Sequence, residues 1–414
     1  MKKYLLTIMA VVVASLTMAQ TIDTSKLSEY DQNAPVGFGA EITGGSDENP
    51  VTVETLSELS NAMSGSTKRT IYVKGTIEFS GLKEYRNISN KTIIGLEGAV
   101  FSNTNHIEQS SSDFSKDKTG ILLLRSCKNI IIRNITFKGA GAYDVDGNDN
   151  LWLYGSTNVW IDHCDFQDGV DGNFDCTEGS DNICVTWCRF RYLITPWSGG
   201  SGGANDHRYS NLWGGSDSKT SDQGKLRTTF TNCWWGDGCR ERMPRIRFGQ
   251  VHLLNCLYSS SVANYCVGGG YRSNAYIEKC AFTTSKAKSN AWKNYATKSG
   301  YTDYNVTITD CSGVSDKQAR SGSIDYFVPS DKYSYTAYDA SQVESVVSNA
   351  DNGAGATIKF TTSGIQDIKS SAAVIRTEYY TLDGQRLASP GKGINIQVVT
   401  RADNSQETRK LILP

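Results

Sequence analysis

The sequence predicts an all-β protein whose main part is a parallel β-helix, a solenoid of stacked coils. Three observations lead to this fold class: a repeated strand motif, its regular spacing, and a stretch from residue 129 to 311 without comparable helical periodicity. A repeat of about 20–30 residues with one strong strand per unit is typical of solenoids. In such a stack, each coil lies on the next and like residues lie above like.

The repeated motif is a run of β-forming residues, a polar residue or two, a cysteine, and an aromatic residue two positions on. It occurs as NVWIDHCDF, NICVTWCRF, RTTFTNCWW, QVHLLNCLY and NAYIEKCAF, with its cysteines at Cys164, Cys188, Cys233, Cys256 and Cys280. The steps between these cysteines are 24, 45, 23 and 24 residues, and we interpret 45 as close to two steps. We expect Asn134 to precede the series, and Cys311 to follow it, at the same place in the coil.

Stacking predicts that the recurring cysteines form an interior ladder of small, buried apolar groups. The alternative is that they form disulfides. Residues at one ladder position point the same way and cannot all pair with each other. The chain has 11 cysteines, an odd number, so at least one lacks an intrachain partner. Cys176, Cys239 and Cys266 lie off the ladder, and a bridge between two of them stays open.

The length, composition and charge of the chain limit the classes of function that it can have. The chain has 414 residues, with 38% hydrophobic residues and 39 glycines, enough for one large, thin core with appendages. The net charge of −1 gives no electrostatic basis for binding nucleic acid or a membrane. Residues Met1 to Ala19 have the basic start and apolar run of a secretory signal peptide. We therefore expect a secreted protein with no membrane span.

Several further elements are expected along the chain. Residues 56–63 read as a short amphipathic helix that caps the open end of the solenoid. Strands are expected within residues 69–79, 91–95 and 120–137, and a second helix over 340–350. The glycine- and serine-rich stretch 193–206 breaks the period and reads either as the wall of a binding site or as a disordered insertion. Trp197 favours the wall, because sugar rings stack on aromatic faces.

Three aspartates in glycine-rich loops form a candidate metal site. Asp171 and Asp175 are four residues apart in DGNFD, and Asp149 precedes the coil that ends in Cys164. Stacking would place Asp149 one coil from the other two, on the outer surface. Converging carboxylates suit a hard cation such as calcium, and they would repel one another without it. The alternative is a solvated acidic face.

A basic cluster follows farther along the chain. Its four arginines lie in RERMPRIRFG: Arg240, Arg242, Arg245 and Arg247. Pro244 marks a bulge or an edge strand. Stacking places this run roughly three coils past Asp175 on the same face, where acidic and basic groups together would suit a polyanionic substrate. The alternative is a solvated basic strand.

These motifs resemble a known family. NVWIDHCDF, the DxxxD that follows it, and RMPRIR followed by a strand are similar to the polysaccharide lyase family 1 pectate lyases. The resemblance runs from about Gly37 to Gly355. It implies a right-handed parallel β-helix, here residues 20–357, that cleaves homogalacturonan (pectin or polygalacturonate) by β-elimination.

The resemblance also implies site residues. Asp149, Asp171 and Asp175 fall on calcium-binding positions. Arg242 falls on the proton-abstracting arginine, and Arg247 falls on an arginine that binds a substrate carboxylate. The implied reaction removes the proton at C5 of a uronate and breaks the C4–O bond. Because arginine is normally protonated, activity is expected to rise well above neutral pH.

Two positions depart from the family pattern, and two hallmarks agree with it. Some members have a further aspartate where this chain has Gly147. A family lysine that contacts the substrate carboxylate is replaced, with Arg208 or Tyr209 in that neighbourhood, and Arg208 is the residue that we expect to take its role. Asp162 and His163 are family hallmarks that we interpret as architectural.

Other readings stay open on the sequence alone. A pectin lyase would act on methylated pectin without calcium, a glycoside hydrolase would need a close pair of carboxyl groups, and a non-catalytic pectin-binding β-helix could lose the arginines. After a linker over 358–377, the tail 378–414 resembles a C-terminal sorting module of the type IX secretion system of Bacteroidetes. We expect a monomer.

Overall fold

The computed structural model describes residues 34–45, 50–359, 374–381, 385–401 and 406–413. The expected signal peptide lies outside these residues. The chain separates into two compact units, residues 1–359 and residues 360–414.

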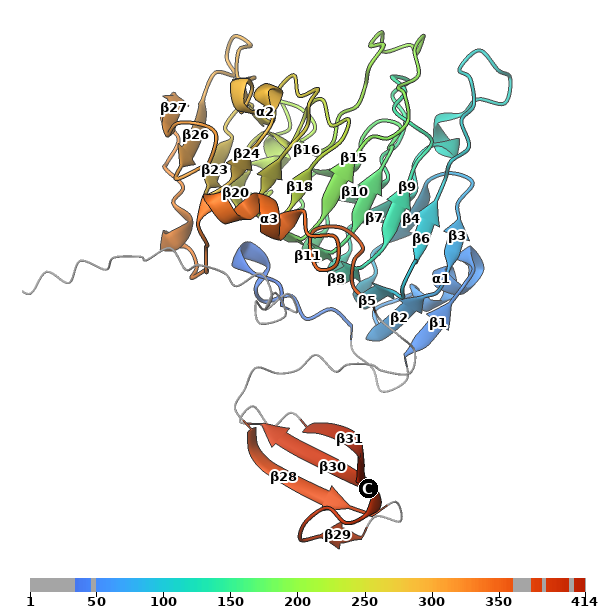
Figure 1. The fold of residues 1–414 in the computed structure, drawn as a ribbon. Coiled ribbons are helices and arrows are strands. Elements are labelled where there is room, and N and C mark those ends of the chain that lie inside the picture. Colours follow the sequence, from blue (N-terminus) through green and yellow to red (C-terminus); the bar gives the residue numbers. More distant parts are fainter. Residues whose placement is uncertain (1–33, 46–49, 360–373, 382–384, 402–405, 414) are drawn as a thin grey trace, which may run out of the picture. The chain divides into compact units, whose positions relative to one another are not determined.

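The first unit is a parallel β-helix, as predicted (Figure 1). It has three sheets, and consecutive coils pair in parallel in each of them apart from the last pair of the first sheet, β26 and β27. The eleven-stranded sheet contains, in order, β1 (Val51–Val53), β2 (Arg69–Val73), β5 (Ser89–Gly95), β8 (Lys128–Arg133), β11 (Thr157–Asp162), β14 (Asp181–Thr186), β17 (Thr228–Thr231), β20 (Gln250–Leu254), β23 (Asn274–Glu278), β26 (Tyr304–Thr309) and β27 (Lys317–Ser321).

The other two sheets have eight strands each. The one that we call the site sheet contains β4 (Lys83–Arg86), β7 (Leu122–Arg125), β10 (Leu151–Tyr154), β13 (Phe174–Thr177), β16 (Leu212–Trp213), β19 (Arg245–Ile246), β22 (Val267–Gly269) and β25 (Trp292–Asn294). The one that we call the aromatic sheet contains β3 (Thr76–Glu78), β6 (Val100–Ser102), β9 (Thr136–Lys138), β12 (Asp165–Gln167), β15 (Arg189–Arg191), β18 (Trp234–Trp235), β21 (Leu257–Tyr258) and β24 (Ala281–Phe282).

The cysteine ladder is confirmed. The 11 cysteines are all free thiols, and ten of them are buried. The pairing of β11 with β8 sets Asp162 opposite Arg133, so Asn134 lies opposite His163 and Ile135 takes the ladder position. The expectation that Asn134 stands in the ladder was therefore wrong by one residue. Cys311 follows Cys280 as expected, because Glu278 pairs with Thr309.

The 45-residue step between Cys188 and Cys233 is one coil and not two. Thr186 pairs directly with Thr231, so no coil lies between them. The extra residues form long connections on either side of β16. The RERMPRIRFG run is therefore two coils past Asp175 rather than three, since β13, β16 and β19 are neighbours.

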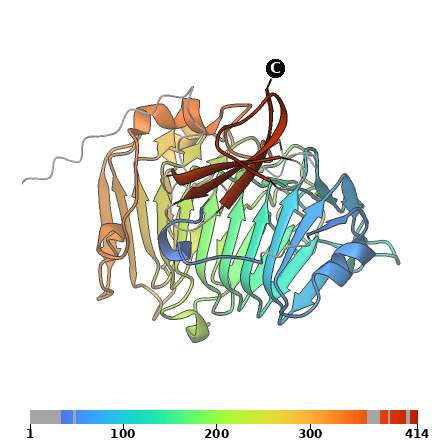
Figure 2. The ribbon, with the colours of Figure 1, turned by 90° about the horizontal axis from the view of Figure 1, so that it is seen from below.

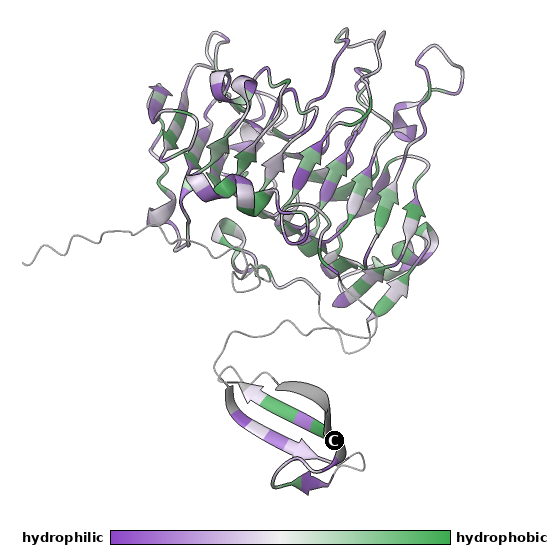
Figure 3. Cartoon of the chain, viewed as in Figure 1, coloured by the Kyte–Doolittle hydropathy of each residue, from purple (hydrophilic) through white to green (hydrophobic). Residues whose placement is uncertain are grey.

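Aromatic rings stack from coil to coil in the core. Neighbouring centroids are 4.7 Å apart for Phe137 and Phe166, 5.2 Å for Phe166 and Phe190, and 5.3 Å for Phe190 and Trp235. These values are close to the spacing of paired strands, about 4.8 Å. The aromatic residue two positions after each ladder cysteine is therefore an inward-facing core residue. Figure 3 shows hydrophobic and hydrophilic residues alternating along many strands.

A short helix, α1 (Leu56–Ala62), lies at the N-terminal end of the solenoid (Figure 2). Its first turn is a capping box: the Thr55 hydroxyl accepts from the Glu58 amide at 3.2 Å, and the Glu58 carboxylate accepts from the Thr55 amide at 3.1 Å. Leu59 is buried against the first coils. The predicted capping helix is confirmed to within one residue.

Other helical turns lie along the surface. They are α2 (Ser285–Ser289), α3 (Val343–Val347) and the 3-10 turns Gly37–Gly39, Lys116–Lys118, Thr220–Asp222, Pro329–Asp331 and Ala340–Gln342. The second predicted helix, over 340–350, is shorter than expected, but its apolar face is as predicted. Val343, Val346 and Val347 are buried with Trp187 and Leu257.

The second unit is a small antiparallel sheet in the order β29 (Arg386–Leu387), β28 (Val374–Tyr380), β30 (Gly393–Arg401), β31 (Gln406–Leu413). The predicted strand-rich tail is present, with one predicted strand divided into the β28–β29 hairpin. Over the described part of the whole chain, the structure contains no helix with the length and apolarity needed to cross a membrane.

Candidate active site

The predicted site residues lie in or beside strands β10, β13, β16 and β19 of the site sheet, and all but Arg247 come before or within a strand. Asp149 stands before β10, Asp171 before β13, and Arg242 before β19. Backbone hydrogen bonds join these entry loops: Asn150 donates to the Gly172 carbonyl at 3.1 Å, and Asn211 donates to the Arg242 carbonyl at 2.7 Å. Parallel stacking therefore brings residues distant in sequence to one edge of the sheet.

Two of the aspartates are buried side by side over Gly172. Asp149 is 5% exposed and Asp175 is 6% exposed. A Cβ atom at Gly172 would lie 2.6 Å from Asp149 Oδ1 and 3.1 Å from Asp175 Oδ1, so the glycine leaves the space that both carboxylates occupy. Asp175 Oδ1 accepts from the Leu212 amide at 2.8 Å. Asp149 Oδ1 is buried without a hydrogen-bond partner.

The pKa values of this pair reflect burial and mutual repulsion. Burial raises the pKa of Asp149 well above its usual range, and the charges of Asp175 and Asp171 raise it further. Burial also raises the pKa of Asp175, to about 7, although Arg242 opposes the shift. Carboxylates held together in this way are stabilised in their charged form by a nearby cation.

The donor set fits a hard cation. An orphaned carboxylate oxygen beside a second buried carboxylate is the kind of ligand that calcium takes. The side chains do not, however, form a closed cage: within the described residues, no group of three or more His, Cys, Asp or Glu side chains stands as a metal-binding cluster. Asp171, the third predicted ligand, lies beside His207, with its Oδ1 3.0 Å from the ring Nε2.

His207 is a site residue that the sequence analysis missed. Its Nδ1 lies 3.1 Å from Asp144 Oδ1 and its Nε2 lies 3.0 Å from Asp171 Oδ1, so the ring lies between two carboxylates. Its centroid is 4.1 Å from that of Tyr209. The polar run Asp-His-Arg-Tyr at residues 206–209, shortly before β16, is the sequence signal that could have indicated it.

Arg242 lies near the aspartates, close enough for their charges to act on its guanidinium. Its guanidinium carbon lies 4.6 Å from the centre of the Tyr209 ring. Burial lowers the pKa of Arg242, but the charges of Asp175 and Asp171 outweigh burial, and its pKa lies above the usual value. A base needs the opposite shift, and a cation between the carboxylates would cancel the charge that raises the pKa.

The two predicted substrate-binding arginines are both held in ion pairs. Arg208 makes a two-pronged pair with Asp206, at 2.7 and 2.6 Å. Arg247 donates to Asp217 at 2.8 Å and to the Gly214 carbonyl at 2.7 Å. A substrate carboxylate would have to exchange with these partners.

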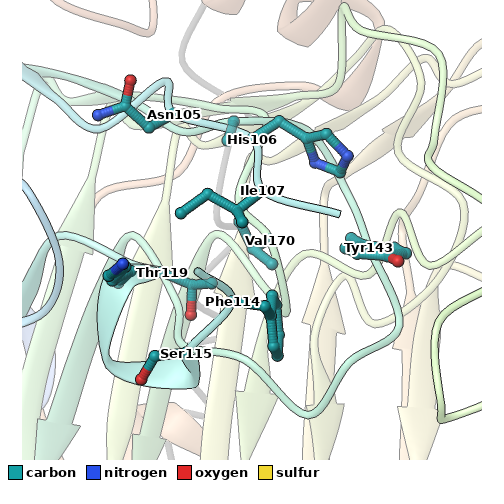
Figure 4. Close-up of a pocket in the computed structure, with 10 residues that line it drawn as sticks. Asn105, His106, Ile107, Phe114, Ser115, Thr119, Tyr143 and Val170 are labelled. Carbon is teal, nitrogen blue, oxygen red and sulfur yellow. The ribbon is translucent and has the colours of Figure 1, made fainter. Parts of the chain in front are cut away.

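The stretch 193–206 packs against a second long loop instead of standing free. Trp197 stacks on His106 with centroids 3.7 Å apart, and its indole nitrogen donates to the Ala140 carbonyl at 2.9 Å. The predicted stacking of Trp197 on a sugar is thus replaced, on one face, by His106. Figure 4 shows Phe114, Tyr143 and Val170 around a small cavity beside this contact, of about 10 Å³, room for one water molecule.

The architectural interpretation of the hallmark pair agrees with its contacts. Asp162 is fully buried in β11 and lies 2.7 Å from Arg133 Nε and 2.8 Å from His163 Nδ1. The Thr186 hydroxyl, on the next coil, also donates to Asp162. This network joins three coils of the eleven-stranded sheet and lies away from the aspartates and Arg242.

Comparison with known proteins decides the family. The family model described as "Pectate lyase" matches residues 1–357. The chain belongs to the pectate lyase family. A pectate lyase E of Dickeya chrysanthemi is 30% identical over 321 residues, which cover 68% of this chain and 79% of that protein. A pectate trisaccharide-lyase of Thermotoga maritima is 32% identical over 243 residues, 54% of this chain.

The match to the first curated relatives is partial: the chain spans 57% of the length of the Thermotoga maritima protein. Solved pectate lyase structures share the fold over a longer range. A Bacillus subtilis pectate lyase variant superposes with a TM-score of 0.58 at 23% identity, covering 80% of this chain and 98% of that one. A Paenibacillus pectate lyase gives a TM-score of 0.62 at 14% identity.

Proposed function

We propose that this protein is a secreted, calcium-dependent pectate lyase that cleaves α-1,4-linked homogalacturonan by β-elimination. The observation that carries the proposal is the buried pair Asp149 and Asp175, with an orphaned carboxylate oxygen, near Arg242 in a pectate lyase family β-helix. Asp171 would complete the ligand set by leaving His207.

Asp149, Asp171 and Asp175 would hold the calcium ion. When bound, the ion supplies positive charge that stabilises the anion developing next to the uronate carboxylate. The same charge favours the ionised form of the aspartates, whose pKa values are raised by burial and mutual repulsion.

Arg242 would act as the base. It takes the proton from C5 of the uronate, the electron pair forms the C4–C5 double bond, and the C4–O bond breaks. The leaving oxygen takes a proton from solvent, and the new chain end is unsaturated. Arg247 and Arg208 would bind substrate carboxylates by exchanging Asp217 and Asp206, which now hold them.

The buried aspartates favour this reaction over that of a pectin lyase, which needs no metal ligands. A hydrolase would leave saturated products. Mass spectrometry of the products formed from polygalacturonate separates these outcomes: unsaturated oligogalacturonides support the proposal, and saturated fragments contradict it.

Export is proposed from Met1–Ala19, and the tail 378–414 is proposed as a sorting module for type IX secretion, with the folded enzyme acting as a monomer. Fractionation of cells that produce the full chain and a chain ending at residue 377 tests this. Retention of the shortened chain inside the cell supports a sorting role, and equal export of both chains contradicts it.

A further inference from the structure

A second group of cationic and hydroxyl side chains extends from the site along the outer face of the site sheet. Arg245 pairs in register with Gly268, and Gly268 pairs with Lys293. Because Ile246 is buried in the core, the neighbouring Arg245 side chain faces outward. Paired strands are about 4.8 Å apart, so Arg245 and Lys293 are about 10 Å apart along the stack.

Tyrosine rings hold these cations in place. The Arg245 guanidinium lies 4.2 Å from the centre of the Tyr295 ring, and the Lys293 ammonium lies 5.1 Å from the same centre. Lys293 also lies 5.8 Å from the centre of the Tyr265 ring. Cation–π contacts fix a cation without neutralising its charge.

Two polar atoms of this group lack a hydrogen-bond partner among the residues that the structure describes. Arg245 Nε and the Tyr265 hydroxyl are buried without a hydrogen bond. Among the described residues, neither Arg245 nor Lys293 makes an ion pair, whereas nearby Arg247 is paired with Asp217. The carboxylate of Glu241, whose charge helps to raise the pKa of Tyr265, accepts a hydrogen bond from Asn264 at 2.6 Å. Buried donors without partners call for a ligand or ordered water.

We propose that Arg245, Lys293 and the Tyr265 hydroxyl form a second carboxylate subsite, which binds a uronate unit of the polymer beyond the unit that reacts. Gly268 stands between the two cations, so no side chain from the intervening strand separates them. The inference rests on the proposed function for the identity of the polymer, and the group itself recognises an anionic sugar. It extends the binding surface by two coils past Arg242.

The test compares Lys293→Gln with Lys298→Gln. Lys298 is also exposed and also lies over a tyrosine ring, Tyr301 at 5.1 Å, but it is not part of the proposed subsite. The KM for polygalacturonate should rise on the order of fivefold in Lys293→Gln, the size of one exposed charge contact, with a smaller rise for trigalacturonate. Lys298→Gln should leave both KM values unchanged. Equal effects of the two variants, or equal effects on both substrates, would overturn the subsite.

A second variant and a binding assay separate this inference from the lyase activity. Tyr265→Phe removes only the orphaned hydroxyl and should weaken binding to polygalacturonate without lowering the melting temperature. Retardation in a gel containing polygalacturonate measures that binding without turnover. If the wild type makes no unsaturated product but Lys293→Gln still weakens retardation relative to Lys298→Gln, the proposed activity is wrong and the subsite stands. Unchanged retardation in both Lys293→Gln and Tyr265→Phe refutes the subsite.

Discussion

The guanidinium of Arg242 rests on the face of the Tyr209 ring, 4.6 Å from its centre. Tyr209 also contacts His207, whose ring nitrogens lie 3.1 Å from Asp144 and 3.0 Å from Asp171. The proposed base Arg242 and the proposed ligand Asp171 are therefore linked through two neighbouring rings, Tyr209 and His207, whose planes are tilted by 44°. The face of the Tyr209 ring can hold the Arg242 guanidinium in position.

Replacing Tyr209 separates its ring from its hydroxyl. Tyr209→Leu removes the aromatic face and should lower kcat roughly tenfold, in line with the strength of a desolvated cation–π contact. Tyr209→Phe keeps the face and should retain most of the turnover. Steady-state kinetics on polygalacturonate would show this order. Equal kcat in the two variants would remove Tyr209 from the positioning of Arg242.

Arg242→Lys tests the proposed base. Lysine keeps the positive charge but not the position of the guanidinium nitrogens, so turnover should fall by about 10²-fold or more. Calcium binding, followed by calorimetry, should persist because the carboxylates are unchanged. Full activity in this variant would contradict the assignment of Arg242 as the base.

The pH dependence of the wild type gives a second test of Arg242. The neutral guanidine is the active base, and its fraction grows as pH rises towards a pKa that lies above the usual arginine value in the metal-free structure. Activity should therefore climb well above neutral pH. An optimum below about pH 6 is incompatible with arginine as the base.

Asp149→Asn should stabilise the metal-free protein. The carboxylate of Asp149 is buried beside Asp175 and lacks a partner for Oδ1, so removing its charge relieves repulsion and should raise the free energy of unfolding by about 1–3 kcal/mol. The same change should abolish the further stabilisation that calcium gives the wild type.

Thermal unfolding with chelator and with calcium measures both effects of Asp149→Asn. The matched control is Asp146→Asn, because Asp146 is exposed and paired with Lys116 at the surface. Asp146→Asn should leave the melting temperature unchanged both with chelator and with calcium. Calcium stabilisation that survives in Asp149→Asn would contradict the proposed ligand set.

A buried histidine far from the site should make the fold sensitive to acid. His252 lies 3.0 Å from the Tyr333 hydroxyl and 3.2 Å from Glu278, and burial lowers its pKa below 6.5 despite the carboxylate. Burial raises the pKa of Glu278, but hydrogen bonds from His252 and Tyr335 outweigh it and the pKa lies below its usual value.

The direction of this pH effect on stability depends on whether the folded or the unfolded chain binds more protons. As pH falls below 6.5, the unfolded chain protonates His252 before the folded chain does, so stability is lost by up to about 1.4 kcal/mol per pH unit. The stability that Glu278 contributes is lost at lower pH, as the pH falls through the lowered pKa of Glu278 in the folded protein. The melting temperature should drop between pH 7 and pH 5, and it should drop less in His252→Gln. An equal drop in both proteins would assign the acid sensitivity to other groups.

The coils were predictable because their signal is local and repeated. Each ladder cysteine follows a β-forming run and precedes an inward aromatic ring, so strand and core could be identified together. The error at Asn134 arose because Ile135 replaces cysteine in that coil, leaving no marker for the register. The coil count failed between Cys188 and Cys233 because a period does not show how many residues loop out of a single coil.

The site was predictable only in part. The stacking of Asp149 near Asp175 follows from the coil period. The partners of Arg208 and Arg247 do not, because Asp206 and Asp217 lie in long loops whose course no repeat fixes. A single histidine in a polar run carries no periodic signal, which explains why His207 escaped notice.

Ultraviolet absorbance of polygalacturonate incubated with the purified protein decides the proposed activity. The double bond formed by β-elimination absorbs, and hydrolysis forms no such bond. We expect a rise in absorbance that requires calcium, disappears with excess chelator, and is absent in Arg242→Lys. A rise that survives chelation and is stronger on methylated pectin, or new reducing ends without absorbance, would contradict a calcium-dependent pectate lyase.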